Sequence, residues 1–233
     1  MFSKTAAWYD ALYSFKNYQQ ESNDIIEVVK KECPNAETVL DVGCGTAEHD
    51  KYLSQVYQID GLDVNADFIA IASRKNPSSA YFCADMIDFN LKKTYDVILC
   101  LFSSIGYVKT KDNVDRTFRC FKQHLNADGI IVVEPWLTPK AWKPEGNIYM
   151  LTAETADGKI CRMNVSEQDG KLSILTFHYL LGTGNRIEYF TERHELGLFT
   201  VQEMYDAFER AGLAVTYDQE GLTGKGLYVA RRE

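Results

Sequence analysis

The sequence predicts an α/β fold, with a doubly wound, mostly parallel sheet of seven strands, helices on both of its faces and an antiparallel β insertion. Strand-like and helix-like segments alternate between residues 38 and 135, a pattern typical of right-handed strand–helix–strand crossovers. The first of these strands leads directly into a glycine turn, Gly43-x-Gly45. After residue 148, β-rich segments separated by turn dipeptides indicate the insertion. The 233 residues suffice for one well-cored domain of this kind.

The N-terminal residues 1–35 are expected to form a helical lid. Apolar side chains recur there at helical spacing, first around Trp8 and Leu12 and again around Ile25 and Val29, which predicts two helices joined near residues 14–18. In the core that follows, strands are expected at 38–42, 58–62, 80–83, 95–101 and 129–134, and helices at 47–54, 66–74 and 111–125. The run Asn126-Ala127-Asp128-Gly129 is expected to end the helix before the fifth strand.

Residues 148–199 are expected to form the antiparallel insertion, a region for substrate or dimer contacts. Its turn signals are Asp157-Gly158, Asp169-Gly170 and Gly182-x-Gly184. The core comprises residues 36–147 and 200–233. A capping box at Thr200–Glu203 predicts a helix that stops at Gly212, followed by two strands near 213–218 and 226–230.

The segment around the glycine turn predicts a cofactor site. Glycines let the backbone turn sharply and approach a ligand closely. A dinucleotide fingerprint would require a third glycine where this chain has Glu48. Asp41, two residues before Gly43, would repel a pyrophosphate but suits a cation. The run Leu-Asp-Val-Gly-Cys-Gly-Thr at residues 40–46 resembles motif I of the class I methyltransferases, whose cofactor S-adenosylmethionine is cationic.

Further motif elements follow at the spacing that such a site requires. Asp63 lies 20 residues after Gly43 at the predicted end of the second strand, where an acid can accept both hydroxyls of a ribose. Asp85 follows the third strand and can accept from an adenine amino group, while the backbone near Met86 meets the ring edge. Either acid alone would more often be a helix cap or a turn residue. The glycine turn, Asp63, Asp85 and the apolar strand at 95–101 occur in this order and at suitable spacing, which favours a cofactor site over these structural roles.

The composition of the chain limits the classes of partner and ligand that it can bind. The net charge of −8 and the absence of a long basic run argue against nucleic acid. The six cysteines form no C-x-x-C pair, and Cys44, Cys83 and Cys100 are expected to be small buried residues of a protein in a reducing compartment. The four histidines have no metal-ligand spacing, so no metal is expected. Without a signal-like N-terminus or a run of about 18 apolar residues, we expect a cytoplasmic protein without membrane contact.

Several segments beyond the glycine turn resemble one family over nearly the whole length. They are Leu101–Tyr107, Val132–Trp136, Leu198–Thr200 and Gly224–Tyr228. These segments are similar to the nucleotide-linked amino-sugar N-methyltransferases of macrolide deoxysugar pathways. The resemblance implies a Rossmann-like class I methyltransferase that forms a homodimer. It also implies methylation, often twice, of the amino group of a dTDP-3-amino-3,6-dideoxyhexose.

The resemblance also assigns roles to residues. The expected cofactor-binding residues are Tyr18, Asp41, Gly43, Cys44, Gly45, Asp63, Val64, Asp85, Met86 and Leu101. Tyr107 is expected near the reacting amino group, and Lys225 stands where an arginine of the family meets the nucleotide diphosphate. The expected substrate-binding residues are Tyr9, Trp136, Arg162 and Lys225. Cys44 is interpreted as a space filler in the turn and not as a nucleophile.

The residues expected at the reacting centre each have a structural alternative. Tyr107 could supply a proton acceptor for the amine or be an ordinary half-buried loop aromatic. Glu134 could neutralise a substrate ammonium or cap a turn. His178 is a catalytic candidate that a satisfied strand histidine would also explain. Trp136 and Trp142 could wall the substrate pocket or pack within the insertion.

Together these features predict an S-adenosylmethionine-dependent methyltransferase that acts on a small-molecule amine by in-line displacement, with a nucleotide-linked amino sugar as first choice. Other acceptors remain open, such as a glycine-like amine, a peptide N-terminus or a natural-product hydroxyl. A cofactor-binding protein without turnover is a further alternative. A nucleic-acid base methylator is disfavoured, because the fourth strand ends in Leu101-Phe102-Ser103-Ser104 and not in an Asn/Asp-Pro-Pro-aromatic loop.

Overall fold

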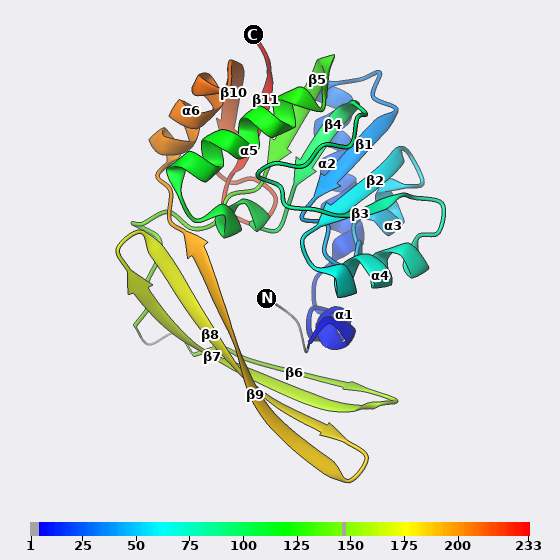
Figure 1. The fold of residues 1–233 in the computed structure, drawn as a ribbon, viewed down its shortest axis with the longest axis vertical. Helices are drawn as coiled ribbons and strands as arrows, with labels where there is room; N and C mark the ends of the chain where they lie inside the picture. Colours follow the sequence, from blue (N-terminus) through cyan, green and yellow to red (C-terminus); the bar gives the residue numbers. More distant parts are fainter. Residues whose placement is uncertain (1–4, 146–147) are drawn as a thin grey trace.

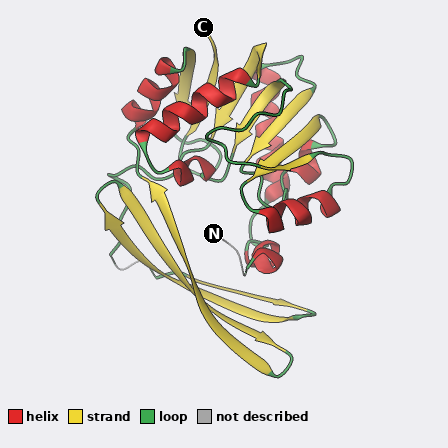
Figure 2. Ribbon diagram, in the orientation of Figure 1, coloured by secondary structure: helices red, strands yellow, loops and turns green. Residues whose placement is uncertain are grey.

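The computed structural model describes residues 5–145 and 148–233, and its strands form two separate sheets (Figure 1). The first four residues of the predicted lid lie outside the described part. The larger sheet carries the helices, and the smaller, four-stranded sheet extends below it (Figure 2). The short helix α1 (Tyr9–Leu12) lies beside the smaller sheet, whereas α2 (Tyr18–Glu32) packs on the larger one (Figure 1).

The larger sheet has seven strands in the order β10-β11-β5-β4-β1-β2-β3. Five neighbours, from β5 to β3, are parallel, and β11 runs antiparallel to both β5 and β10. The chain reverses its direction of winding between β1 and β4, and ligands of such sheets bind at this switch point. The strands are β1 (Thr38–Val42), β2 (Gln58–Asp63), β3 (Tyr81–Cys83), β4 (Tyr95–Cys100), β5 (Leu125–Val133), β10 (Leu213–Asp218) and β11 (Leu227–Arg232).

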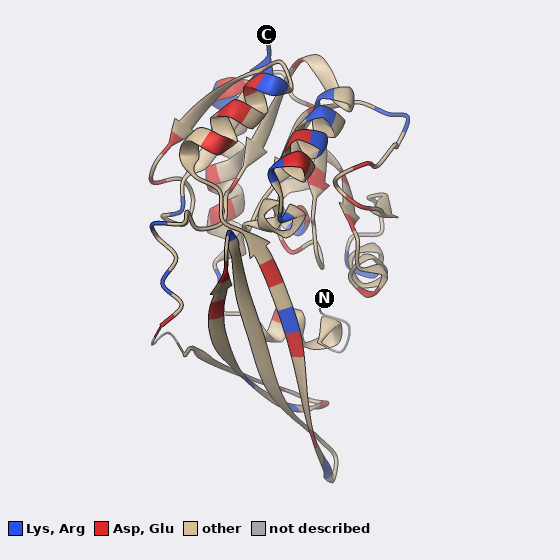
Figure 3. Cartoon of the chain, turned by 60° about the vertical axis from the view of Figure 1, so that its left-hand side comes forward, with Lys and Arg blue, Asp and Glu red and all other residues tan. Residues whose placement is uncertain are grey.

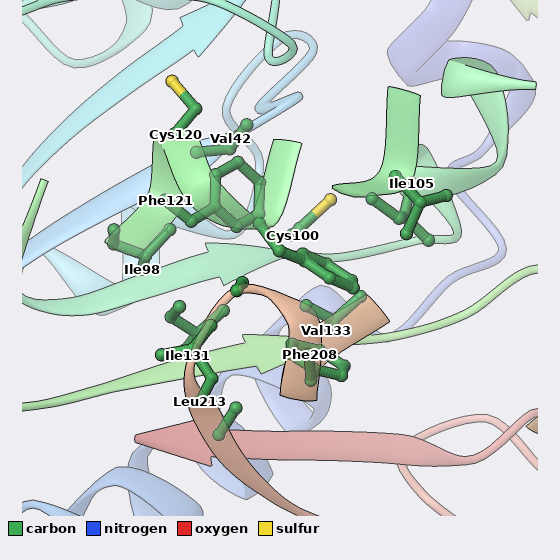
Figure 4. Close-up of a cluster of buried hydrophobic side chains, with 14 of the residues drawn as sticks. Val42, Ile98, Cys100, Ile105, Cys120, Phe121, Ile131, Val133, Phe208 and Leu213 are labelled. Carbon is green, nitrogen blue, oxygen red and sulfur yellow. The ribbon is translucent and has the colours of Figure 1, made fainter. Parts of the chain in front are cut away.

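Helices cover both faces of this sheet because its strands alternate two apolar sets of side chains. One set, which includes Leu40, Ile98 and Ile131, packs under α5 (Lys111–Gln123) and α6 (Val201–Arg210). The other set faces α2 (Tyr18–Glu32) and α3 (Asp50–Leu53). Figure 4 shows the first cluster, in which Phe121 and Phe208 reach the sheet from the two helices. The remaining helical segments are η1 (Ala6–Trp8), α1 (Tyr9–Leu12), α4 (Ala66–Lys75) and η2 (Ser104–Val108).

The smaller sheet is an antiparallel meander of β6 (Met150–Thr155), β7 (Gly158–Asp169), β8 (Leu172–Thr183) and β9 (Arg186–Gly197). Its three tight connections fall at the predicted turn dipeptides, and Gly170 and Gly184 adopt the positive φ that glycine allows there. Because neighbouring strands are in continuous register, the side chains divide between an inner and an outer face. The inner face packs against the N-terminal segment and α4.

The predicted fold class is confirmed, with three local corrections. Residues 126–129 do not end a helix: α5 ends at Gln123, and the four residues form an irregularity within β5, where Leu125 pairs with Tyr95 and Ile130 with Val97. Asn126 donates to the Asp96 carboxylate at 2.7 Å and so stabilises this irregular part of β5. The spacing of apolar residues in the sequence could not reveal such a polar contact. Helix α3 is shorter than predicted. Cys83 is exposed at the end of the short edge strand β3, whereas Cys100 is buried as expected.

The N-terminal segment is attached to the glycine-turn region by a hydrogen bond and by ion pairs. The Asp10 carboxylate of α1 accepts from Lys75 Nζ of α4 at 2.7 Å and from the Thr46 hydroxyl. Lys75 also pairs with Glu48. These contacts fix α1 beside the segment that follows the glycine turn.

The capping box of α6 provides a test of local stability. The Thr200 hydroxyl accepts from the Glu203 backbone N–H, and the Glu203 carboxylate accepts from the Thr200 backbone N–H. We expect Thr200→Ala to lower the free energy of unfolding by about 1 kcal/mol. Urea denaturation measures the change, and Thr94→Ala, at an exposed loop threonine, is the control that should change stability little. Equal stabilities of the two variants would contradict the role of the cap.

Candidate active site

A cavity of about 800 Å³ lies where the carboxyl ends of the parallel strands face the four-stranded sheet. This volume falls within the range of small-molecule sites, about 300–1,000 Å³. Residues from the strand ends, the N-terminal helices, the loop after β5 and strands β6, β7 and β8 line it together. Both sheets and the N-terminal segment therefore form the cavity together.

The ends of β1, β2 and β3 form one half of this cavity, called here the cofactor half. It is lined by Gly43, Gly45, Asp63, Val64, Asn65, Ala84, Asp85, Met86 and Ile87. Gly43 has a φ of 75°, and a Cβ on it would lie 2.7 Å from the Cβ of Ser104, so a side chain is excluded on steric grounds. Asp63 accepts from the backbone N–H groups of Gly45 at 3.0 Å and Asn65 at 2.8 Å. These bonds hold its carboxylate at the end of β2.

Asp41 does not line the cavity, contrary to the sequence-based expectation. Asp41 is 2% exposed and lies beside the buried Asp50, one of whose carboxylate oxygens accepts from Tyr81 OH at 2.8 Å. Burial raises the pKa of Asp41 well above its usual range, and the nearby Asp50 charge adds to this shift. The pair therefore retains a proton and stands behind the glycine turn without facing a cofactor.

Three other residues expected at the cofactor also lie outside the cavity lining. Leu101 packs in the core between the sheet and α2. The thiol of Cys44 contacts its own turn, 3.7 Å from the Gly45 carbonyl oxygen, in keeping with a space-filling side chain. Tyr18 lies at the start of α2, with its ring 4.9 Å from that of His49. None of the three side chains lines the space that Gly43 and Gly45 border.

A strained turn after β4 carries Tyr107 into the cavity. Phe102 and Ser103 have φ values of 49° and 63°, a left-handed conformation that non-glycine residues rarely adopt. The buried Glu134 carboxylate accepts from the Phe102 backbone N–H at 2.7 Å and from the Thr223 hydroxyl. Glu134 itself is not among the cavity-lining residues. It therefore holds the turn and the C-terminal loop, which corrects its interpretation as a partner for a substrate ammonium.

Tyr107 lines the cavity, and its hydroxyl lies 3.0 Å from Nδ1 of His194 on β9. Burial raises the pKa of the Tyr107 hydroxyl, so it remains protonated. His178, the predicted catalytic histidine, lies on the outer face of the four-stranded sheet, hydrogen-bonded to Tyr189 OH at 2.7 Å. Because successive strand residues point to opposite faces, β8 turns Phe177 and not His178 toward the cavity. The catalytic interpretation of His178 is therefore not supported.

The other half of the cavity, called here the acceptor half, is aromatic and cationic. Tyr9, Trp136, Arg162 and Lys225, the residues expected to bind substrate, all line the cavity. Arg162 donates to Tyr13 OH at 2.9 Å, and its guanidinium lies 4.3 Å from the centre of the Phe177 ring. Lys225 donates to the Ser103 hydroxyl at 3.2 Å. Burial lowers the pKa of Lys225, which the Glu134 carboxylate partly offsets.

Sequence reasoning missed several residues of the site. They are Tyr13, Phe102, Ser104, Asn164, Phe177 and, behind Tyr107, His194. The alternation of β9, where Phe190, Glu192, His194 and Leu196 are buried, is a signal that could have identified His194 as inward-facing. Phe102 and Ser104 lie in an irregular turn whose direction has no sequence periodicity.

Comparison with known proteins gives whole-length similarities. A family model described as a methyltransferase domain matches residues 15–218. The chain is 34% identical over 215 residues to dTDP-3-amino-3,6-dideoxy-alpha-D-glucopyranose N,N-dimethyltransferase of Streptomyces fradiae, covering 91% of this chain and 84% of that protein. It is 30% identical to the dTDP-3-amino-3,4,6-trideoxy-alpha-D-glucopyranose N,N-dimethyltransferase of Streptomyces venezuelae, covering 95% and 94% respectively.

Solved structures agree with these similarities. The crystal structure of Streptomyces venezuelae DesVI superposes with a TM-score of 0.90 at 30% identity and covers 97% of each chain. The S-adenosylmethionine-bound structure of CalS10, an amino pentose methyltransferase of Micromonospora echinaspora, gives 0.86 at 28% identity, covering 97% of this chain and 96% of that one. Both sheets are thus shared with these proteins.

The buried Asp41–Asp50 pair leads to a testable dependence of stability on pH. The unfolded chain releases the shared proton near the ordinary aspartate pKa of 3.8, whereas the folded protein retains it to higher pH. Stability is therefore greatest below that value and falls as pH rises toward the raised folded pKa, by at most about 1.4 kcal/mol per pH unit. Asp41→Asn, whose amide donates permanently, should remove this loss, as urea unfolding over a pH series measures.

An exposed aspartate provides the control for this experiment. Asp67→Asn, on the surface of α4, should keep the wild-type slope of stability against pH. If the free energy of unfolding changed with pH in the same way for the wild-type protein and the Asp41→Asn variant, the Asp41–Asp50 pair would not retain a proton in the folded state.

Proposed function

The chain belongs to the methyltransferase-domain family and is an S-adenosylmethionine-dependent methyltransferase, and from this premise we propose that its acceptor is the amino group of a nucleotide-linked amino sugar. The relatives named above act on dTDP-linked amino sugars, and their similarity extends over both sheets. Because the four-stranded sheet lines the acceptor half of the cavity, the similarity includes the region that would select the acceptor.

The observation that carries this proposal is the division of charge within the cavity. The acidic residues that line it, Asp63 and Asp85, come from the ends of β2 and β3. The cationic residues that line it are Lys109, Lys143, Arg162 and Lys225, and of these Lys109 is paired with Glu195 at 2.8 Å. An anionic acceptor such as a nucleoside diphosphate sugar fits the acceptor half, whereas a small neutral or cationic amine would use none of these charges.

The cofactor half fits S-adenosylmethionine by its chemistry and its shape. Among the described residues that line it, two carry negative charge and none is Lys or Arg, which favours a sulfonium and an ammonium over a phosphate. A Cβ on Gly43 would meet Ser104, so no side chain fits at Gly43 and its bare backbone borders the cavity. We propose that Asp63 binds the ribose hydroxyls, that Asp85 and Met86 meet the adenine, and that Gly43, Gly45 and Val64 border the cofactor. When bound, S-adenosylmethionine supplies a methyl group for direct transfer to a nucleophile.

The protein's contribution to transfer is to hold a neutral amine in line with the methyl group. Near-attack distances are about 3–3.5 Å, and such positioning supplies a large share of the rate enhancement. Aromatic side chains, including Tyr9, Tyr13 and Trp136, give this part of the cavity an apolar wall that excludes water. We propose that Tyr107 contacts the amine, and that Arg162 and Lys225 hold the anionic portion of the acceptor.

Mass spectrometry of reaction products tests the substrate class. Purified protein is incubated with S-adenosylmethionine and a panel of dTDP- and UDP-linked 3- and 4-amino sugars, together with free amino acids, amines and hydroxylated natural products. We expect one or two methyl groups on one amino-sugar nucleotide, with matching S-adenosylhomocysteine. A gain on a free amine or a hydroxyl, and on no sugar nucleotide, would refute the proposed acceptor class.

The role of Asp63 can be measured independently of the acceptor. Asp63→Ala should raise the Kd for S-adenosylhomocysteine by about 10- to 100-fold, since a charge-assisted hydrogen bond contributes about 1.5–3 kcal/mol. Isothermal titration calorimetry measures it, with Asp67→Ala on the nearby surface of α4 as the matched control. Unchanged affinity of the Asp63 variant would exclude the ribose contact.

We further propose a homodimer that associates through the outer face of the four-stranded sheet. This face exposes Met150, Met163, Val165, Leu180, Ile187 and Tyr189, each at least 45% exposed. In Figure 3 charged residues concentrate on the helices around the parallel sheet, and much of the four-stranded sheet carries neither charge. A group of exposed apolar side chains on one sheet face is typical of an association surface.

Leu180→Asp tests this interface. Leu180 is 51% exposed near the middle of the outer face, opposite Tyr189 on β9. A charge placed there should convert a dimer to a monomer without unfolding it, because the side chain packs against no core. Sedimentation velocity measures the change, and Ser78→Asp in the exposed loop after α4 should remain dimeric. A wild-type monomer would contradict the proposal directly.

Cytoplasmic location remains a prediction that the residues support. In the described part of the chain, no helix combines the length and apolar character needed to cross a membrane. All six cysteines are free, which suits a reducing compartment.

A further inference from the structure

Behind Tyr107, polar groups continue into the four-stranded sheet. The Tyr107 hydroxyl lies 3.0 Å from His194 Nδ1, and His194 is 1% exposed. On the same face of β9, the Glu192 Oε2 atom lies 4.0 Å from His194 Nε2. That oxygen also accepts from the Thr5 hydroxyl at 2.8 Å. A line of groups able to carry a proton thus leads from the cavity wall into the protein.

The protonation states of Tyr107 and His194 decide which of the two donates the hydrogen bond between them. Burial lowers the pKa of His194, although Glu192 raises it in part, so the imidazole is neutral near pH 7. The Tyr107 phenol is protonated. It therefore donates its proton to Nδ1, and the ring carries its own hydrogen on Nε2, the nitrogen that faces Glu192. This leaves the lone pairs of the Tyr107 oxygen available to an N–H group in the cavity.

We propose that His194 is a positioning residue and proton acceptor for the methylation, acting through Tyr107. This inference rests on the proposed amine acceptor. The acceptor enters as an ammonium, and one of its N–H bonds breaks as the proton joins the Tyr107 oxygen while the Tyr107 proton passes to His194 Nδ1. The nitrogen keeps the electron pair of that bond as its lone pair. With the cofactor bound, this lone pair would form the new N–C bond while the S–C bond breaks and leaves its electron pair on sulfur. The proton resides on the imidazole, and the resulting imidazolium faces the Glu192 carboxylate.

The other groups around His194 are compatible with this step. The Phe177 ring from β8 lies 4.8 Å from the imidazole and shields it from water. Arg162 from β7 opposes a second positive charge and lowers the pKa of both His194 and Tyr107. Arg162 is itself hydrogen-bonded to Tyr13 and interacts with Tyr179. Glu192 is thus the acidic group placed to stabilise the imidazolium, and Arg162 favours its later deprotonation.

Nitrogen NMR of the imidazole gives a readout that does not depend on turnover. In ligand-free protein labelled at histidine, His194 should show a neutral ring protonated at Nε2, and Tyr107→Phe should shift the Nδ1 resonance by removing its donor. Saturation with S-adenosylhomocysteine and the amino-sugar nucleotide should convert the ring to imidazolium. A sugar nucleotide with a hydroxyl in place of the amine should leave it neutral. An imidazolium or an Nδ1–H tautomer in the ligand-free protein would overturn the proposal.

Kinetics of matched variants separate proton acceptance from packing. We expect His194→Phe and Tyr107→Phe each to lower kcat by about 100-fold with little change in KM. The double variant should be no slower than the slower single variant, because the two residues act as one line. His194→Asn, which keeps an acceptor near Nδ1 but does not titrate, should restore part of kcat. Tyr217→Phe, on β10, is the control for loss of a tyrosine hydroxyl.

The possible outcomes distinguish this inference from the proposed function. If wild-type protein methylates an amino-sugar nucleotide while His194→Phe retains full kcat, the acceptor class stands and the role of His194 is refuted. Multiplicative losses in the double variant would also refute it. If no amino-sugar nucleotide is methylated, the function fails, and the tautomer of His194 in ligand-free protein still decides whether it can accept the Tyr107 proton.

Discussion

The turn after β4 is the constraint on which the cavity depends. Two consecutive non-glycine residues, Phe102 and Ser103, are left-handed there, at a cost of about 1–3 kcal/mol each. The Glu134 carboxylate offsets this strain by accepting from the Phe102 backbone and from Thr223, thereby joining the ends of β4 and β5 to the C-terminal loop. Because the chain reverses so sharply, Phe102, Ser104 and Tyr107 all reach the cavity from one short segment.

Negative and positive side chains are separated within and around the cavity. Behind the glycine turn, the Asp41–Asp50 pair shares a proton and so contributes less negative charge than two free carboxylates. On the cavity side of the glycine turn, the Asp63 carboxylate accepts from backbone N–H groups and lines the cavity. The acceptor half carries the positive charge of Arg162 and Lys225. A cationic cofactor and an anionic acceptor would thus each meet charge of opposite sign, and their reacting groups would meet where the two halves join.

The two faces of the four-stranded sheet carry different kinds of side chain. Its inner face supplies Arg162, Phe177 and the buried His194 to the site, and its outer face presents exposed apolar side chains. Since strand side chains alternate, a register slip by one residue would exchange the two sets. The continuous pairing of β7, β8 and β9 over their lengths holds this register. The proposed acceptor contacts and the proposed association surface therefore depend on the same hydrogen-bonded ladder.

The sequence by itself determined what is local or follows from a shared sheet edge. The Thr200–Glu203 cap and the hairpin turns depend on neighbouring residues, and Asp63 and Asp85 were predictable because the carboxyl ends of parallel strands meet at one edge. Tertiary structure alone decided that Asp41 meets Asp50, that Glu134 supports a turn, and that His194 and not His178 faces the site. Periodicity separates the two faces of a strand, but only packing decides which face turns toward the cavity.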